Sequence, residues 1–327
     1  MTLADNSRPH TPRITLIDTL RGIALLAMAS YHFTWDLEFF GYIEPGTATT
    51  GWWRIYARAI ASSFLFLAGV SLVLAHYPTI RWRSFWKRFA MVAGAAAAIS
   101  IATLFAIPQE WIFFGILHSI AAASLLGLAF LRLPPLATGS AAALLVLAMI
   151  VDSYLAPGAL RSHLFDPKVL SWIGFAATAP RSNDFVPLFP WLAALLAGVA
   201  VARLAVDRAW LLSLSRVQTR PNLLSRAGRH SLAIYLVHQP VLIALVYVLS
   251  QVSPPPQPDL RQSELNSCQA DCTFQGNEVG FCTRFCICTV DELAAQSLLE
   301  PLRAGAIDVQ TDNRVRIVAE ECSIRSR

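Results

Sequence analysis

The amino-acid sequence predicts an all-α protein: a polytopic transmembrane helical bundle of about seven spans, followed by a small cysteine-rich C-terminal tail. Three observations support this class. The 327 residues are 55% hydrophobic and 14% charged, with a mean hydropathy of +0.50, whereas a soluble domain carries about 25% charged residues. The apolar residues form long runs separated by short polar segments. All 6 cysteines follow the last of these runs.

The runs divide the chain into four parts. Residues 1–12 are polar and contain two prolines, so we expect a disordered lead. Residues 13–251 form the membrane domain, because each apolar run is long enough to cross a hydrocarbon core of about 30 Å. Residues 252–260 are a stiff proline-rich linker, and residues 261–327 are the tail. The expected spans are residues 13–37, 55–76, 89–107, 111–131, 137–155, 188–206 and 231–250.

The basic residues predict the orientation of the spans in the bilayer. Most of the lysines and arginines fall in segments on the same side of the membrane as the N-terminus. Cytoplasmic loops carry an excess of lysine and arginine. We therefore expect an integral protein of a bacterial inner membrane, with the N-terminus in the cytoplasm and the tail in the periplasm. No nucleic-acid partner is expected, because the basic residues are dispersed. The outer loops hold Arg54, Arg58, Arg161, Lys168 and Arg181.

The tail contains a repeated cysteine spacing. Cys268 and Cys272 are four residues apart, as are Cys282 and Cys286, so each pair lies on one face of a helix. Two short helices joined by a tight loop could bring the pairs together as two disulfides in an oxidising compartment. The alternative is a metal knuckle in a reduced, cytoplasmic tail. The predicted orientation favours disulfides, and the partners of the other two cysteines stay open.

The first apolar run carries four ionisable residues on one stripe. At about 100° per residue, Arg21 and His32 lie about 20° apart around a helix. Asp18 and Asp36 fall within about 40° of His32. Polar side chains inside a membrane face protein or water, so the stripe marks an interior site or path. Asp18 and Arg21 most simply form an ion pair, although Arg21 could instead attract the phosphates of a cytoplasmic cofactor.

His32 is the strongest candidate for chemistry. Near neutral pH a histidine can accept and return a proton or be acylated, and Asp36 one turn away could orient it. The alternative is a structural hydrogen bond. Two more histidines are expected near mid-bilayer: His118, about 9 Å from the outer end of the fourth span, and His238 in the last span. They could gather around His32 or make structural hydrogen bonds. No metal is expected, because no local ligand motif accompanies them.

A polar and aromatic segment precedes the sixth span. It contains Asp184 and Trp191, together with the amide side chain of Asn183. This combination suits the binding of sugar hydroxyls or an amine, and it equally suits a plain helix start beside the membrane interface. Glycine-rich phosphate-binding motifs do not occur in the sequence, so a soluble nucleotide-binding domain is excluded.

Several segments in a fixed order resemble one family. They are Ile17–Ala24 with His32, Phe64–Gly69, Gly115–His118, Asp184–Trp191 and Gly228–Pro240. Over residues 13–250 the chain is similar to bacterial members of the transmembrane acyltransferases that include heparan-alpha-glucosaminide N-acetyltransferase. The resemblance implies a membrane enzyme that takes acetyl-CoA or another acyl-CoA from the cytoplasm. Its acceptor would be an extracytoplasmic glycan or amino sugar, acylated on an amine or hydroxyl.

Together, the residues and this resemblance predict roles for individual side chains. His32 would be a general base or transient acyl carrier, assisted by Asp36. Arg21 and Asp18 would form the acyl-CoA site. The acceptor would be held by His118, Asp184, Trp191, His238 and Gln239. The main alternative is a membrane transporter or lipid-linked-sugar carrier that uses the polar stripe as a path, and a third is a structural partner that binds through its tail.

Overall fold

The structure is a computed structural model that describes residues 14–217, 220–256, 260–274, 277–304, 306–307 and 312–326. Its regular elements are helices, which confirms the predicted all-α class. The predicted lead of residues 1–12 lies outside the described residues. The chain divides into two compact units, one of residues 1–39 and 43–249 and the other of residues 40–42 and 250–327. Each unit is described by itself.

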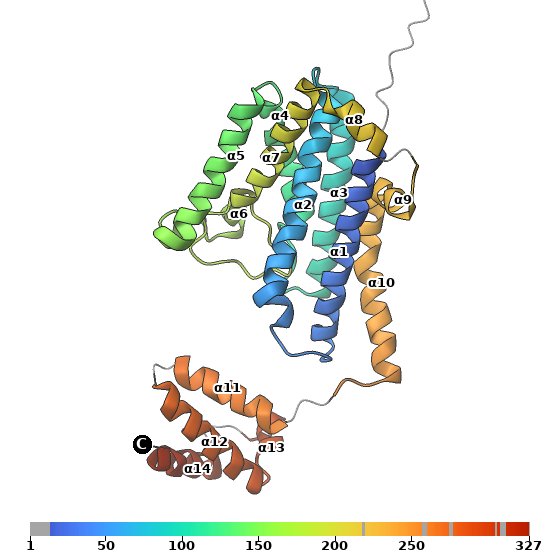
Figure 1. Cartoon of the computed structure of the whole chain (residues 1–327). Helices are drawn as coiled ribbons and strands as arrows, with labels where there is room; N and C mark the ends of the chain where they lie inside the picture. The colour runs from blue at the N-terminus through green and yellow to red at the C-terminus, as the bar shows by residue number, and fades with distance from the viewer. Residues whose placement is uncertain are drawn as a thin grey trace, which may run out of the picture. The chain divides into compact units, whose positions relative to one another are not determined.

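Within the described residues, the first unit is built from seven long helices joined by short elements (Figure 1). The long helices are α1 (Thr15–Phe39), α2 (Gly51–His76), α3 (Trp82–Ala106), α4 (Ile116–Phe130), α5 (Pro135–Ile150), α7 (Leu188–Asp207) and α10 (Ser231–Val252), the last of which ends in the second unit. The short elements are η1 (Thr47–Thr49), η2 (Val151–Leu155), η3 (His163–Phe165), α6 (Lys168–Ser171), α8 (Trp210–Val217) and α9 (Leu223–Arg229).

Five helices in the described part are long and apolar enough to cross a membrane: α2, α3, α5 with its continuation η2, α7 and α10. Helix α4 is apolar but shorter, and α1 carries the polar stripe. The polytopic helical class is therefore supported, and the count of seven spans stays a prediction.

The prediction that the fourth span begins near residue 111 is wrong, because α4 begins at Ile116. The preceding backbone is engaged elsewhere: Asn183 N–H donates to the Glu110 carbonyl, and Val186 N–H donates to the Phe114 carbonyl. These bonds to a distant segment, together with an isolated β-bridge between Phe114 and Phe185, keep residues 110–114 out of the helix.

Close contact between α2 and α7 depends on two glycines. A Cβ atom on Gly69 would overlap the carbonyl oxygen of Leu195, and one on Gly198 would overlap that of Phe66. The absence of both side chains lets the two helix backbones touch, as small residues commonly do between membrane helices. The main apolar core surrounds this crossing and includes Leu65, Leu72, Leu131, Leu196 and Val199.

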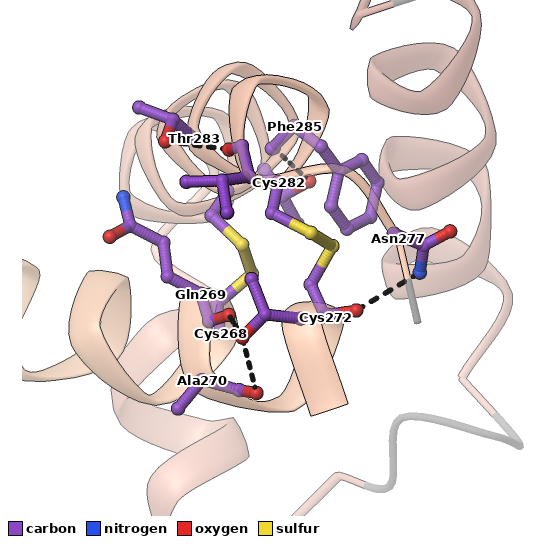
Figure 2. The surroundings of a disulfide bond; sticks show 12 residues. Cys268, Gln269, Ala270, Cys272, Asn277, Cys282, Thr283 and Phe285 are labelled. Carbon is purple, nitrogen blue, oxygen red and sulfur yellow. Dashed lines mark hydrogen bonds between the residues drawn. A yellow bond between two sulfur atoms is a disulfide. The ribbon is translucent and has the colours of Figure 1, made fainter. Parts of the chain in front are cut away.

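In its described residues, the second unit contains four helices held by three disulfides. These helices are α11 (Leu260–Phe274), α12 (Val279–Ala295), α13 (Leu299–Arg303) and α14 (Asn313–Ser326). Two disulfides join α11 to α12, as Figure 2 shows, and the third joins α12 to α14. The predicted pair of bridged helices is confirmed, and the metal knuckle is wrong because every cysteine sulfur is bonded to another. The pairs are Cys268 with Cys286, Cys272 with Cys282, and Cys288 with Cys322.

Candidate active site

Two histidines that are distant in sequence meet inside the first unit. The ring of His32 on α1 lies against that of His238 on α10, with centroids 5.0 Å apart and planes at 71°. One turn further along α1, an Asp36 oxygen accepts a 2.7 Å hydrogen bond from the side-chain amide of Gln239. Four of the predicted site residues are therefore gathered where α1 meets α10. The assistance of Asp36 to His32 stays a prediction, because the bond that Asp36 makes is with Gln239.

Three polar atoms at this meeting point are buried and lack a hydrogen-bond partner within the described part of the chain. They are the second carboxylate oxygen of Asp36, the Nε2 nitrogen of His238 and the side-chain oxygen of Gln239. Asp36 is fully buried. Buried polar atoms are rarely left unpaired, because desolvation without a hydrogen bond costs about 1–3 kcal/mol. Such a concentration of unpaired atoms is typical of a site that binds a polar ligand.

Two tyrosines complete the contacts around the histidines. The Tyr31 ring lies 5.7 Å from that of His32, and the Tyr235 ring lies 5.5 Å from that of His238. Asp184 is close enough to act electrostatically on the hydroxyls of both tyrosines. The sequence analysis did not select these tyrosines, although each lies within one helical turn of a candidate histidine.

Asp184 caps the start of α4. One of its carboxylate oxygens accepts a 2.9 Å hydrogen bond from the Ile116 backbone N–H. The preceding residue is Gly115, where any Cβ would overlap this carboxylate. Burial raises the pKa of the Asp184 carboxyl to about 6, and the bond from Ile116 opposes that shift. The predicted alternative placed Asp184 at the start of the sixth span, whereas its carboxylate caps the start of α4. Its role in acceptor binding stays a prediction.

His118 and Trp191 have packing roles. Nδ1 of His118 accepts a 3.2 Å hydrogen bond from Gly115 N–H, and its Nε2 lies 3.2 Å from the Ser100 hydroxyl. His118 therefore lies in the first turn of α4 and not about 9 Å into the helix, because α4 starts later than expected. Its depth in the bilayer stays a prediction. Trp191 packs half-buried against the main apolar core. Acceptor binding by these two residues stays a prediction.

A cavity of about 320 Å³ lies in the first unit. Three arginines line it: Arg21 from α1, Arg88 from α3 and Arg229 from α9. The remaining lining is almost entirely apolar, and it includes Tyr235, whose ring contacts His238. An elongated ligand with anionic and apolar parts would match this lining.

The arginine of the polar stripe is held in a fixed position. Arg21 forms the predicted ion pair with Asp18 at 2.8 Å, and it also donates to the hydroxyl of Ser71. Helix α9 packs tightly against the same turn of α1. Glycine at positions 22 and 228 allows this approach, because a Cβ on either residue would overlap backbone atoms of the other helix. This packing places the α9 arginine beside the cavity.

The described residues contain no group of three or more histidine, cysteine, aspartate or glutamate side chains that could hold a metal ion. The chemistry at the α1 and α10 contact is that of imidazole, carboxylate, amide and phenol groups. Such groups can bind a polar acceptor and move protons, as acyl transfer requires.

The sequence of this region matches a known protein family. Residues 13–240 match the family described as heparan-alpha-glucosaminide N-acetyltransferase, catalytic. The chain belongs to this family. The matched region contains both histidines of the pair and all three cavity arginines, so the candidate site lies within the part of the chain that matches the family. Membership and the apolar helices support a membrane acetyltransferase-type function. No curated protein and no solved structure gives a significant match to the chain.

Proposed function

We propose that the protein transfers an acetyl or other acyl group from cytoplasmic acyl-CoA to an extracytoplasmic sugar amine or hydroxyl. The observation that carries this proposal is that one residue, Tyr235, links the basic cavity to the histidine pair. Tyr235 lines the cavity and its ring also contacts His238. A donor whose phosphates lie near the arginines could therefore extend its acyl end toward His32.

The arginines fit the phosphate groups of such a donor. Guanidinium groups form strong, charge-assisted hydrogen bonds to phosphate oxygens. Arg21 is already oriented by Asp18 and Ser71, so binding would order few additional side chains. The apolar walls suit the less polar arm of the donor. His32 would then act as base or transient acyl carrier, with Asp36 assisting.

We further propose that the N-terminus is cytoplasmic and the tail periplasmic. The three disulfides of the tail support this orientation, because disulfides persist in oxidising compartments. In spheroplasts, a membrane-impermeant thiol reagent applied after mild reduction is expected to label the tail cysteines. Labelling that appears only after lysis would contradict the orientation.

The transfer itself is tested with purified protein, radiolabelled acetyl-CoA and a mixture of amino sugars. Wild-type protein is expected to produce labelled acceptor, and His32→Ala is expected to reduce the rate by about 100-fold or more. His163→Ala is the control, because His163 is an exposed residue of η3 that pairs with Asp166 and does not belong to the candidate site. If folded wild-type protein neither binds nor consumes any of several acyl-CoA donors, the proposed function is wrong and a transporter becomes the better hypothesis.

The cavity is tested separately with Arg88→Gln. The loss of one lining guanidinium is expected to raise the KM for acetyl-CoA about tenfold, because one charge-assisted bond is worth roughly 1.5–3 kcal/mol. The rate at saturating donor should change little. Arg83→Gln provides the control, since Arg83 is an exposed residue of the same helix that does not line the cavity.

A further inference from the structure

The proton on the His238 ring has a defined position. Nδ1 of His238 lies 2.6 Å from the backbone carbonyl oxygen of Tyr235. A carbonyl oxygen can only accept a hydrogen bond, so Nδ1 must carry the hydrogen and donate it. In the neutral ring the other nitrogen, Nε2, is then unprotonated. The helix itself thus prepares one nitrogen of His238 to accept a proton.

That unprotonated nitrogen lacks a partner. Nε2 of His238 is buried and makes no hydrogen bond to any described residue. The His32 ring lies against the His238 ring, and the bond between Asp36 and Gln239 ties the next residue of α10 to α1. Because an unpaired buried acceptor is costly, the missing partner is best supplied by an N–H or O–H group of a ligand.

We propose that His238 is the residue that takes the proton from the acceptor during acyl transfer. This inference rests on the proposed function. In this scheme the transfer is direct and the base is His238, while His32, whose ring lies against that of His238, holds that ring in place. The acceptor nitrogen or oxygen forms a bond to the acyl carbon and gives its proton to Nε2 of His238. The bond between that carbon and the donor sulfur breaks, and its electron pair goes to the sulfur. The proton then passes from Nε2 to the thiolate, which restores neutral His238 and releases the thiol.

Several other titratable groups lie near His238 and affect any pH profile. They are Tyr31, His32 and Asp36 on α1, Tyr235 on α10, and Asp184 from the loop before α7. A variant that removes only Nε2 of His238 therefore isolates its contribution.

The decisive variant is His238→Asn. The asparagine amide nitrogen lies where Nδ1 does, so it can still donate to the Tyr235 carbonyl, but it has no counterpart of Nε2. We expect kcat to fall by about 10²–10⁴-fold while the KM for acetyl-CoA stays within about threefold. The rise of kcat with pH that depends on an imidazole should disappear. In His238→Ala, added imidazole should restore part of the rate.

The matched control is His230→Asn. Nδ1 of His230 also lies near a backbone carbonyl, that of Arg226 at 3.1 Å, but this histidine is exposed. The control should keep wild-type kcat. If wild-type protein is active and folded His238→Asn keeps a kcat within about threefold of it, His238 is not the proton acceptor, although the proposed function stands. If wild-type protein is inactive with every donor, the proposed function and this inference are both wrong.

Discussion

The membrane unit and the tail are both helical, yet different interactions hold their helices together. The membrane unit contains no cysteine, and its helices touch through glycine pairs and an apolar core. The tail is small and carries three disulfides around a minor core. A domain of about 70 residues buries too little apolar surface to be very stable, so cross-links compensate. The comparison indicates that the membrane unit relies on apolar packing and close glycine contacts, whereas the tail relies on covalent bonds.

Reduction of the disulfides should produce the largest difference in stability between the two units. By loop-closure entropy, a disulfide closing 34 residues contributes about 3.8 kcal/mol and one closing 10 residues about 2.7 kcal/mol. Loss of all three is expected to unfold the tail and leave the melting of the membrane unit unchanged. Limited proteolysis with and without reductant, followed by mass spectrometry, would locate the new cleavages. An equal loss of protection in both units would contradict the comparison.

The glycine contact between α2 and α7 offers the next largest effect. Gly69→Val places a branched side chain against the Leu195 backbone, which cannot move aside as a flexible side chain would. We expect a loss of about 1–3 kcal/mol or more in the free energy of unfolding. Gly94→Ala on α3 is the control, because nothing lies within 4 Å of the place that its new methyl group would occupy. That change should be neutral or stabilising by up to about 1 kcal/mol. Thermal unfolding in detergent measures both.

The bond between Asp36 and Gln239 should show coupling. Gln239→Leu leaves the buried Asp36 carboxylate without this partner, so we expect a loss of about 1–3 kcal/mol in stability. The double variant Asp36→Leu with Gln239→Leu removes both polar groups and should recover much of that loss, while acyl transfer stays abolished. A double-mutant cycle of unfolding free energies measures the coupling. Strictly additive effects would show that the bond contributes nothing.

The sequence could predict the features that depend on local pattern. Apolar runs located the long helices, and the spacing of Cys268, Cys272, Cys282 and Cys286 predicted two bridged helices, because both signals arise within one or two turns. The ion pair between Asp18 and Arg21 followed from the same spacing rule. Local patterns therefore gave the elements and their short-range contacts.

Contacts between distant segments were harder to predict. The start of α4 and the position of His118 depend on residues 183–186, which bond to the backbone of residues 110–114. The pairing of Asp36 with Gln239 joins residues that are 203 positions apart. A helical wheel of α1 alone shows which side is polar, but it cannot show which helix faces that side.

The smallest expected effect on stability concerns an ion pair at the surface of the tail. Hydrogen bonds from Arg314 lower the pKa of the Asp312 carboxyl to about 2, below the usual value of 3.8. Since the folded pKa is depressed, the stabilisation is fully present above about pH 4 and is lost as the pH falls through 2. Asp312→Asn should therefore lower the melting temperature of the tail slightly at pH 7, by much less than loss of a disulfide, and should match wild type near pH 1.5. A difference that persists at pH 1.5 would mean that the carboxylate charge is not its source.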